Sequence, residues 1–324
     1  MACANHNVLP ADPEVNSRKL NIVRNVRVEP ASPQRPALRQ GIVWLASYPK
    51  SGNTWTRIFF RNLLSDRPES ISLDEIGFGH AAERRLFDEL AGIDSADLTP
   101  DEVDSLRPAV YEHMVEQATE LPILMKAHDA YTYLPDGRPL LSRTATAGAI
   151  LLIRNPLDVA VSYAHHGGQS DFDRTIELMS SRNELLNRTR CGLSNQLRQK
   201  MCGWSGFYES WKNAGVPMLV LRYEDMKADP QNCFTAATRF AGFAHSKAEI
   251  AAAIDRSRFE NLQQQEREQG FRERMPDCQA FFRRGKVGTW REELSPQQPE
   301  QIICDHGDLM REFGYLSTDG SPAY

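Results

Sequence analysis

The sequence lacks paired cysteines, long apolar runs and an excess of basic residues, and each absence excludes a class of protein. The six cysteines are scattered, with no C-x-x-C pair and no histidines at zinc spacing, so we expect reduced thiols in a cytoplasmic protein. No window approaches the roughly 18 consecutive apolar residues of a membrane span, and the N-terminus has no apolar secretion signal. The net charge of -5 gives no overall positive field for a nucleic-acid partner.

What the sequence does contain is typical of one globular domain. Of its 324 residues, 41% are hydrophobic and 25% are charged, which is enough to bury a full core. Residues 1–40 are rich in Pro, Asn and Arg without any period, so we expect a flexible N-terminal arm, which could add one strand near residues 21–28. Residues 41–316 form the predicted domain and residues 317–324 a C-terminal tail.

From residue 41 onward, apolar runs alternate with helical patterns. We predict strands at residues 42–47, 122–126, 149–154 and 217–223. Nearly continuous apolar strands are typical of a parallel sheet covered on both faces. Predicted helices lie at residues 53–64, 156–166, 197–213, 230–240 and 249–256. The alternation predicts an α/β fold with a single domain, in which a central parallel sheet is flanked by helices and ligands bind beyond the carboxyl ends of the strands.

Two stretches interrupt this alternation. Residues 80–120 have a purely helical pattern, in which "LTPDEVDSL" has a Thr cap, a Pro at the first helical position and acids in the first turn. Residues 262–280 are polar, charged and interrupted by Gly and Pro. Both stretches are either surface additions or parts of a substrate pocket and its cover.

The stretch "SYPKSGNTW", residues 47–55, follows the first predicted strand and leads into a predicted helix. The free N–H groups of a helix N-terminus bind anions, while Lys50 adds a charge and Ser51 and Thr54 add hydroxyl donors. A phosphate-binding P-loop has its lysine after the second glycine, whereas Lys50 precedes Gly52. The stretch therefore predicts a P-loop-like strand-loop-helix that binds a phosphate-like group in a different way from kinases.

A second anion site is predicted in "LLIRNPLDVAVSY", residues 151–163. Arg154 ends an apolar strand, and Pro156 opens a helix in which Asp158 and Ser162 share one face. Arg154 could instead simply pair with Asp158. A third candidate is "FFRRGKVGTWRE", residues 281–292, in which basic side chains lie next to glycines that let a ligand approach the backbone.

His128 is the candidate general base. It follows a buried strand in "ILMKAHDAY", two residues after Lys126, at the sheet edge where α/β folds place their chemistry. Its imidazole titrates near neutrality, although an isolated histidine is more often structural than catalytic.

These motifs together resemble the cytosolic-type sulfotransferases, which use 3'-phosphoadenosine 5'-phosphosulfate (PAPS) as donor. "SYPKSGNTW" is similar to the 5'-phosphosulfate loop of that family, "RNPLDVAVSY" to its 3'-phosphate motif and "FFRRGKVGTW" to its closing segment. "KAHD" lies where the family has its catalytic histidine, and "RYEDMKADP" matches a further family stretch. The resemblance extends from about residue 41 to residue 316, and "SGNTW" and "GTWREELS" are more similar to the bacterial branch.

The resemblance implies roles for individual residues. Lys50, Lys126, His128 and Ser162 would be catalytic. The donor would be bound by Lys50, Ser51, Gly52, Asn53, Thr54, Trp55, Arg154, Ser162, Phe259, Arg283, Arg284 and Gly285. Within this set Trp55 and Phe259 would stack on adenine, whereas Arg154, Ser162 and residues 283–285 would bind the 3'-phosphate. Where animal enzymes have a tyrosine near the adenine, our alignment gives Met201, and the animal dimerisation motif is absent, so the oligomeric state, including a homo-oligomer, stays open.

The implied reaction is in-line transfer of a sulfuryl group to a small-molecule hydroxyl. Lys50 would stabilise the leaving phosphate, Lys126 the equatorial oxygens, and His128 would accept the acceptor's proton. Sulfuryl carries one negative charge fewer than phosphoryl, and the sequence has no acidic metal-binding motif, so we expect no metal. An amine or polysaccharide acceptor, a nucleotide kinase and a non-catalytic nucleotide-binding protein remain as alternatives.

Overall fold

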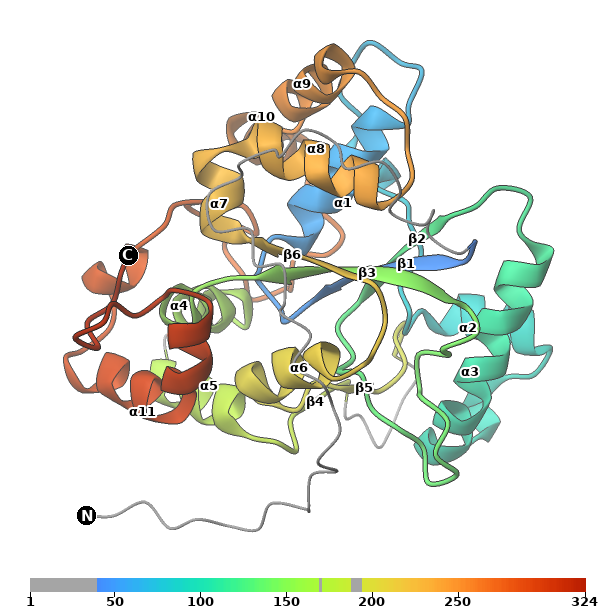
Figure 1. Ribbon diagram of the computed structural model, residues 1–324, viewed down its shortest axis with the longest axis horizontal. Coiled ribbons are helices and arrows are strands. Elements are labelled where there is room, and N and C mark those ends of the chain that lie inside the picture. Colours follow the sequence, from blue (N-terminus) through green and yellow to red (C-terminus); the bar gives the residue numbers. More distant parts are fainter. Residues whose placement is uncertain (1–39, 169–170, 188–193) are drawn as a thin grey trace.

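The computed structural model describes residues 40–168, 171–187 and 194–324, which form an α/β domain around a parallel sheet (Figure 1). The strands are β1 (Ile42–Ser47), β2 (Ile123–Ala127), β3 (Thr146–Ile153) and β6 (Met218–Arg222), in the spatial order β2-β1-β3-β6. All neighbours pair in parallel. The four predicted strands are confirmed, with boundaries that differ by up to three residues.

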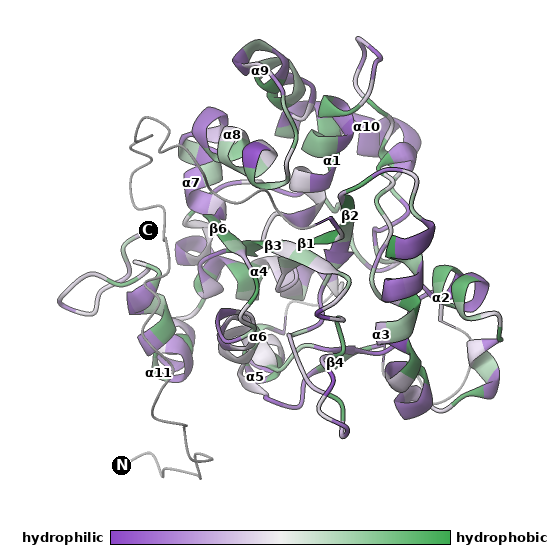
Figure 2. Cartoon of the chain, turned by 45° about the vertical axis from the view of Figure 1, so that its right-hand side comes forward, coloured by the Kyte–Doolittle hydropathy of each residue, from purple (hydrophilic) through white to green (hydrophobic). Residues whose placement is uncertain are grey.

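Two apolar layers cover the sheet because alternate residues of β1 point to opposite faces. Val43 and Leu45 pack in one cluster with residues of α1 (Asn53–Leu63) and α8 (Pro230–Phe240). Trp44 and Ala46 pack in a second cluster, with residues of α4 (Pro156–His166), α6 (Gly203–Lys212) and α11 (Gln297–Glu312). Figure 2 shows the apolar strands at the centre and hydrophilic residues on the outer helices. This burial on both faces explains why the strands are apolar throughout.

The other helices extend these layers. On the side of α1 and α8 lie α7 (Tyr223–Ala228), α9 (Lys247–Arg256) and α10 (Phe259–Gln269), and on the opposite side lies α5 (Phe172–Ser180) (Figure 1). Of the other predicted helices, those at residues 53–64, 156–166, 230–240 and 249–256 are confirmed within two residues. A short helical turn, η1 (Leu73–Glu75), follows α1, and another, η3 (Thr289–Glu292), forms the end of the third candidate loop.

The helix predicted at residues 197–213 is wrong in its first half. The pair β4 (Leu185–Leu186) and β5 (Gln199–Lys200) is antiparallel, and α6 begins only at Gly203. Cys202 and Gly203 have φ values of 60° and 67°, a left-handed conformation that no α-helix continues through. A Cβ at position 203 would lie 2.6 Å from the Met179 carbonyl oxygen, so only glycine fits there.

Residues 80–120 contain two helices, α2 (Arg84–Ala91) and α3 (Pro100–Gln117), joined by the short turn η2 (Ser95–Asp97). The predicted cap is confirmed, since the Thr99 side chain accepts a hydrogen bond from the Glu102 N–H. The prediction of a purely helical stretch is wrong at its start, where His80 forms a parallel bridge with Lys126 at the edge of the sheet.

Of the predicted N-terminal arm and C-terminal tail, the structure describes the tail. The predicted arm, with its strand near residues 21–28, lies outside the described residues except for Gln40. The tail packs on the domain, since the Tyr324 carbonyl oxygen accepts a hydrogen bond from Trp290 and the Tyr324 hydroxyl pairs with Arg222. None of the described helices has the length and apolar character needed to cross a bilayer.

Candidate functional site

The loop between β1 and α1 presents a free helix N-terminus at the carboxyl edge of the sheet. Lys50 and Gly52 have φ values of 66° and 98°, so the chain turns sharply before α1. Gly52 occupies the cap position and supplies no side-chain hydrogen bond, which leaves the first N–H groups of α1 available to an anion. This is the predicted P-loop-like arrangement.

The other side chains of the loop divide between structural and binding positions. The Asn53 amide donates to the Leu45 carbonyl oxygen at 2.7 Å and to the Ser47 hydroxyl at 3.2 Å, and so ties the loop to β1. Ser51 is buried, and its hydroxyl lies 3.3 Å from that of Tyr208. The Thr54 hydroxyl is buried next to Arg57. The side-chain amide of Asn53 therefore holds the loop in place, and the group of this residue that remains for a ligand is its backbone N–H.

The register of the sheet brings the two predicted catalytic lysines to one edge. Lys126 is opposite Leu45 in the β1–β2 pair, and Lys50 follows β1 beyond that same edge. Burial lowers the pKa of Lys50 to about 7 and that of Lys126 to about 8. The Lys126 charge adds to the lowering at Lys50, as does the charge of Arg154. A group of desolvated, mutually repelling cations is suited to a multiply charged anion.

His128 follows β2 and is opposite the end of β1. Its Nδ1 lies 2.7 Å from the Ser47 carbonyl oxygen, so Nδ1 carries the proton and Nε2 is left as an acceptor. Burial and then the Lys126 charge lower the pKa of His128 to about 3. The imidazole is therefore neutral at physiological pH, which is the protonation state of a general base.

Arg154 connects the first and third candidate loops. Its guanidinium donates to the Lys50 carbonyl oxygen at 3.2 Å and to the Lys286 carbonyl oxygen at 3.1 Å, and it lies over the Tyr223 ring at 4.4 Å. The Nε atom of this buried side chain has no hydrogen-bond partner among the described residues. A buried guanidinium N–H without a partner is suited to an anionic ligand.

The alternative that Arg154 simply pairs with Asp158 does not account for these contacts. The two side chains approach only to 3.9 Å, and the Asp158 carboxylate instead accepts hydrogen bonds from the Gly288 N–H, the Thr289 hydroxyl and the Trp290 N–H. Asp158 therefore anchors the third loop against α4. Ser162 lies half-buried in the second turn of α4, and no hydrogen bond or ion pair of the described residues connects it with the lysines.

The third loop brings Gly285 against Phe259. Gly285 has a φ of 60°, and a Cβ there would lie 2.5 Å from the Phe259 ring. The two arginines before it pair with acidic side chains, Arg283 with Glu293 at 2.8 Å and Arg284 with Glu292 at 2.5 Å. The structure thus joins Phe259 with the glycine predicted to contact the same ligand, while both arginines are held by neighbouring carboxylates.

A pocket of about 320 Å³ next to this contact is lined by Trp55, Lys227 and Phe259. Lys227 Nζ lies 5.7 Å from the Trp55 ring centre and 5.8 Å from that of Phe259. Aromatic surfaces around a concave site are suited to a flat heterocycle such as adenine. The pocket therefore unites the two predicted stacking residues, which are far apart in the sequence.

Tyr223 joins the candidate site, whereas Met201 lies in the core. Tyr223 directly follows β6, and its ring contacts Trp55, Arg154 and the face of Gly52. Met201, the position aligned with the tyrosine of the animal enzymes, is fully buried in the core cluster that contains Trp204 and Phe207. The position of Tyr223 at a strand end was the signal that could have identified it.

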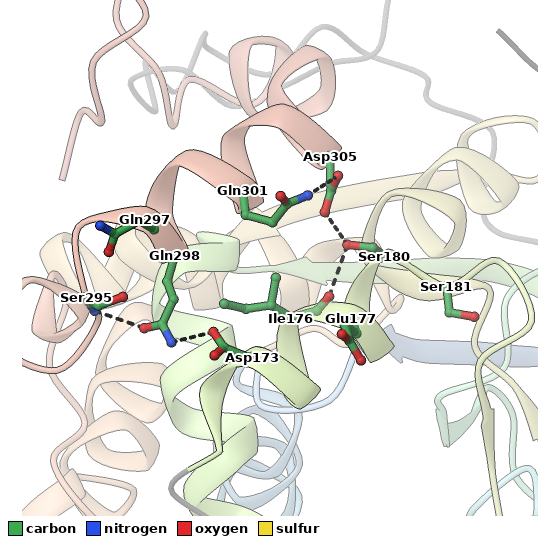
Figure 3. Close-up of a pocket in the computed structure, with 10 residues that line it drawn as sticks. All are labelled: Asp173, Ile176, Glu177, Ser180, Ser181, Ser295, Gln297, Gln298, Gln301 and Asp305. Atoms are coloured by element: carbon green, nitrogen blue, oxygen red, sulfur yellow. Dashed lines mark hydrogen bonds between the residues drawn. The ribbon is translucent and has the colours of Figure 1, made fainter. Parts of the chain in front are cut away.

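A second cavity, of about 780 Å³, lies elsewhere, between α5 and α11 (Figure 3). Its polar lining is internally bonded: Ser180 donates to Asp305 at 2.6 Å, and Gln298 donates to Asp173 at 2.7 Å. It contains none of the predicted site residues. In the part of the chain that the structure describes, no three His, Cys, Asp or Glu side chains are grouped so as to bind a metal ion.

The comparisons with known proteins assign the family. A model of the sulfotransferase domain matches residues 40–314, so the chain belongs to the sulfotransferase domain family. Luciferin sulfotransferase of Photinus pyralis is 26% identical over 273 residues, which are 80% of this chain and 69% of that protein. Flavonol 3-sulfotransferase of Flaveria bidentis is 25% identical over 279 residues, 80% of this chain and 78% of that protein.

A solved structure supports the fold. Mouse sulfotransferase SULT7A1 complexed with PAP has a TM-score of 0.54 and 18% identity to this chain, over 85% of this chain and 87% of that chain. The parallel sheet with its strand-loop-helix is therefore the fold of a sulfotransferase.

Proposed function

We propose that the protein transfers the sulfuryl group of PAPS to a hydroxyl group of a small-molecule acceptor. The observation that carries this proposal is the grouping of Lys50, Lys126 and the Nε2 atom of His128 at one edge of the sheet, next to the free N-terminus of α1. A nucleotide-binding protein without activity has no need of a neutral, oriented imidazole at that place.

The donor fits the residues that surround this edge. The loop residues Lys50, Ser51, Gly52, Asn53 and Thr54 bind the 5'-phosphosulfate, in part through backbone N–H groups. Trp55, Phe259 and Tyr223 surround the adenine. Arg154, Ser162, Arg283, Arg284 and Gly285 bind the 3'-phosphate, and the unpartnered Nε of Arg154 supports this assignment. The two arginines of the third loop exchange their carboxylate partners for the phosphate when the donor binds.

His128 acts as the general base of the reaction. With its Nδ1 proton bound to the Ser47 carbonyl oxygen, Nε2 accepts the proton of the acceptor hydroxyl as the oxygen attacks sulfur. Lys126 stabilises the oxygens of the transferred group and Lys50 the bridging oxygen of the leaving phosphate. Since sulfuryl carries one charge fewer than phosphoryl, these lysines suffice and the reaction needs no metal.

The acceptor is a small molecule, as the names of the luciferin and flavonol relatives suggest. Residues 80–120 and 262–280 surround its pocket and cover it. We further propose that the enzyme is of the cytosolic type, that it is similar to the bacterial branch and that it acts in the cytoplasm.

The test is transfer of radiolabelled sulfate from PAPS to a panel of phenols, alcohols and amines, each with and without EDTA. Transfer to hydroxyl acceptors that EDTA leaves intact is the expected result. Preferred labelling of amines would replace the hydroxyl acceptor with an amine. Activity that needs magnesium and ATP would contradict the proposal in favour of a kinase.

A further inference from the structure

Lys126 forms an ion pair that joins it to two residues outside the predicted site. The Glu273 carboxylate lies 3.5 Å from Lys126 Nζ, and Arg57 Nη2 binds the same carboxylate at 2.6 Å and 2.8 Å. Arg57 belongs to α1, Lys126 to β2 and Glu273 to the segment that follows α10. The triad therefore links the sheet, the helix of the donor loop and the expected acceptor cover.

This triad is sheltered from water. Arg57 is 3% exposed, Lys126 is 8% exposed and the Glu273 side chain is 24% exposed. Charges in such surroundings interact more strongly than charges on the surface. The attraction of Lys126 and Arg57 outweighs the effect of burial and lowers the pKa of Glu273 to about 2, so the carboxylate is ionised at physiological pH.

The geometry leaves Lys126 free to act on a substrate. An ammonium group has three N–H donors, and the contact with Glu273 uses one of them. The carboxylate fixes the direction of the ammonium group, and the remaining donors are available to the oxygens of the transferred group. With two cations and one carboxylate, the triad keeps a net positive charge, so an incoming anion is attracted to it as a whole.

We propose that Glu273, held by Arg57, is a positioning residue that orients the ammonium group of Lys126 toward the transferred sulfuryl group and keeps it protonated. This inference rests on the proposed function. It gives the segment after α10 a second role, since closure of the acceptor cover also completes the charge arrangement around Lys126. Phe281 of the same segment lies 3.9 Å from Lys50 Nζ, so the segment contacts both lysines.

The other charges around Lys126 act in known directions. Burial lowers its pKa, Glu273 raises it and Arg57 lowers it. The remaining charged or titratable neighbours are Lys50, His80, His128 and His166, each of which is affected by the Lys126 charge. The three histidines are neutral near pH 7, because burial lowers the pKa of each. Glu273 is thus the carboxylate that keeps Lys126 charged.

The direct test is the titration of Lys126 in the protein without donor. Carbon-13 NMR of ε-labelled lysine follows the amine, and the loss of one signal in Lys126→Arg assigns it. In Glu273→Gln the midpoint should fall by about one unit or more, as expected for the loss of an opposite charge at this distance. In Arg57→Gln the midpoint should rise, because that change removes a positive neighbour.

Glu266→Gln is the matched control. Glu266 is a buried glutamate of α10 whose carboxylate accepts the N–H groups of Phe281 and Phe282, so it anchors the same segment without contacting Lys126. The Lys126 midpoint should stay unchanged in this variant even if the melting temperature falls. An unmoved midpoint in folded Glu273→Gln, or an equal shift in Glu266→Gln, would overturn the inference. If Glu273→Gln does not fold, Arg57→Gln takes its place. A higher titration midpoint of Lys126 in that variant supports the inference, and an unchanged or lower midpoint overturns it.

A kinetic measurement separates this inference from the proposed function. If wild-type protein transfers sulfate from PAPS, the alkaline limb of kcat/KM, to which Lys50 and Lys126 both contribute, should become steeper and move to lower pH in Glu273→Gln but not in Arg57→Gln. Failure of the wild-type protein to use PAPS contradicts the proposed function but leaves the NMR result standing. Transfer by wild type with the same pH profile in both folded variants contradicts the positioning role alone.

Discussion

At the scale of single residues, the candidate site depends on protonation states that burial imposes. His128 has a neutral imidazole because its pKa is lowered to about 3, mainly by burial and then by the Lys126 charge. Its Nδ1 contact with the Ser47 carbonyl oxygen determines which nitrogen is basic. Low basicity weakens a general base, and we expect an anionic donor bound next to Lys126 to offset this effect by raising the pKa of the imidazole.

We expect His128→Ala to lose about 10²- to 10⁴-fold in turnover, the usual contribution of a general base. A phenol of low pKa should lose less than an alcohol, because it is already partly ionised. Bisphosphate affinity and the melting temperature should change little. A purely structural His128 would instead lower the melting temperature and damage all acceptors and nucleotide binding equally, so the three measurements on one variant distinguish the roles.

Arg154→Ala should weaken 3',5'-bisphosphoadenosine while barely affecting adenosine 5'-phosphosulfate, which has no 3'-phosphate. Each charge-assisted hydrogen bond to the phosphate contributes about 1.5–3 kcal/mol, or more than tenfold in affinity. Arg143→Ala is the matched control, because Arg143 also donates to two carbonyl oxygens, those of Ala214 and Gly215, outside the site. Equal losses for both nucleotides in calorimetric titrations would assign Arg154 to holding the loops rather than to the 3'-phosphate.

At the scale of elements, the third loop is positioned by one helix and one ring. Asp158 of α4 binds three donors of residues 288–290, and Gly285 packs directly on Phe259 at the start of α10. Because Phe259 also lines the pocket next to Trp55, the loop, α10 and α1 meet where the adenine is expected. A change in the loop should therefore affect nucleotide binding.

Gly285→Ala tests this arrangement, with Gly242→Ala as its control. Both glycines have a positive φ, 60° and 86°, so each alanine costs about 1 kcal/mol or more of backbone strain. The Cβ at position 285 would also collide with Phe259, whereas nothing lies within 4 Å of a Cβ at position 242. Both variants should lose stability in denaturant titrations, but only Gly285→Ala should lose affinity for the bisphosphate. If the two variants bind the bisphosphate equally well, the contact between Gly285 and Phe259 does not support nucleotide binding.

These elements also show what the sequence could and could not predict. The strands were predictable because both faces are buried, and the loop before α1 because Lys50, Ser51 and Gly52 are consecutive. The start of α6 was not predictable, since the left-handed turn at Cys202 interrupts an otherwise helical pattern. The Arg57–Glu273 ion pair could not be predicted from the sequence for a different reason. Its two residues come from distant segments, and only the path of the chain after α10 brings them together.

At the scale of the whole molecule, an acidic chain carries a local cationic site. The net charge of -5 does not attract an anionic donor over long distances, so the affinity depends on the protonation of a few buried cations. Lys50 is the most sensitive of them, because burial lowers its pKa to about 7. Below pH 7 Lys50 is already protonated in the free protein. Above pH 7 it is mostly neutral, so it must take up a proton when the ligand binds.

The sign of the resulting pH effect follows from this difference. A bound 5'-phosphate raises the pKa of Lys50, so binding takes up a proton wherever the pH lies between the free and bound values. We expect the affinity for 3',5'-bisphosphoadenosine to be highest near pH 7 and to fall by up to about tenfold per unit above it. Near pH 8 the ligand's own phosphates are fully ionised, since their second pKa is about 6, so the proton uptake is that of the protein.

Calorimetric titration at pH 8 in two buffers of different ionisation enthalpy, HEPES and Tris, measures this uptake directly. Wild-type protein should take up close to one proton per bisphosphate bound, through Lys50. Lys50→Arg is the matched variant, because a guanidinium stays protonated throughout this range. Its proton uptake should be lower by close to one proton, which leaves the contribution of Lys126 with its pKa of about 8, and its affinity should depend less on pH. Equal uptake in the two proteins would place the titrating group elsewhere and remove Lys50 from contact with the 5'-phosphate.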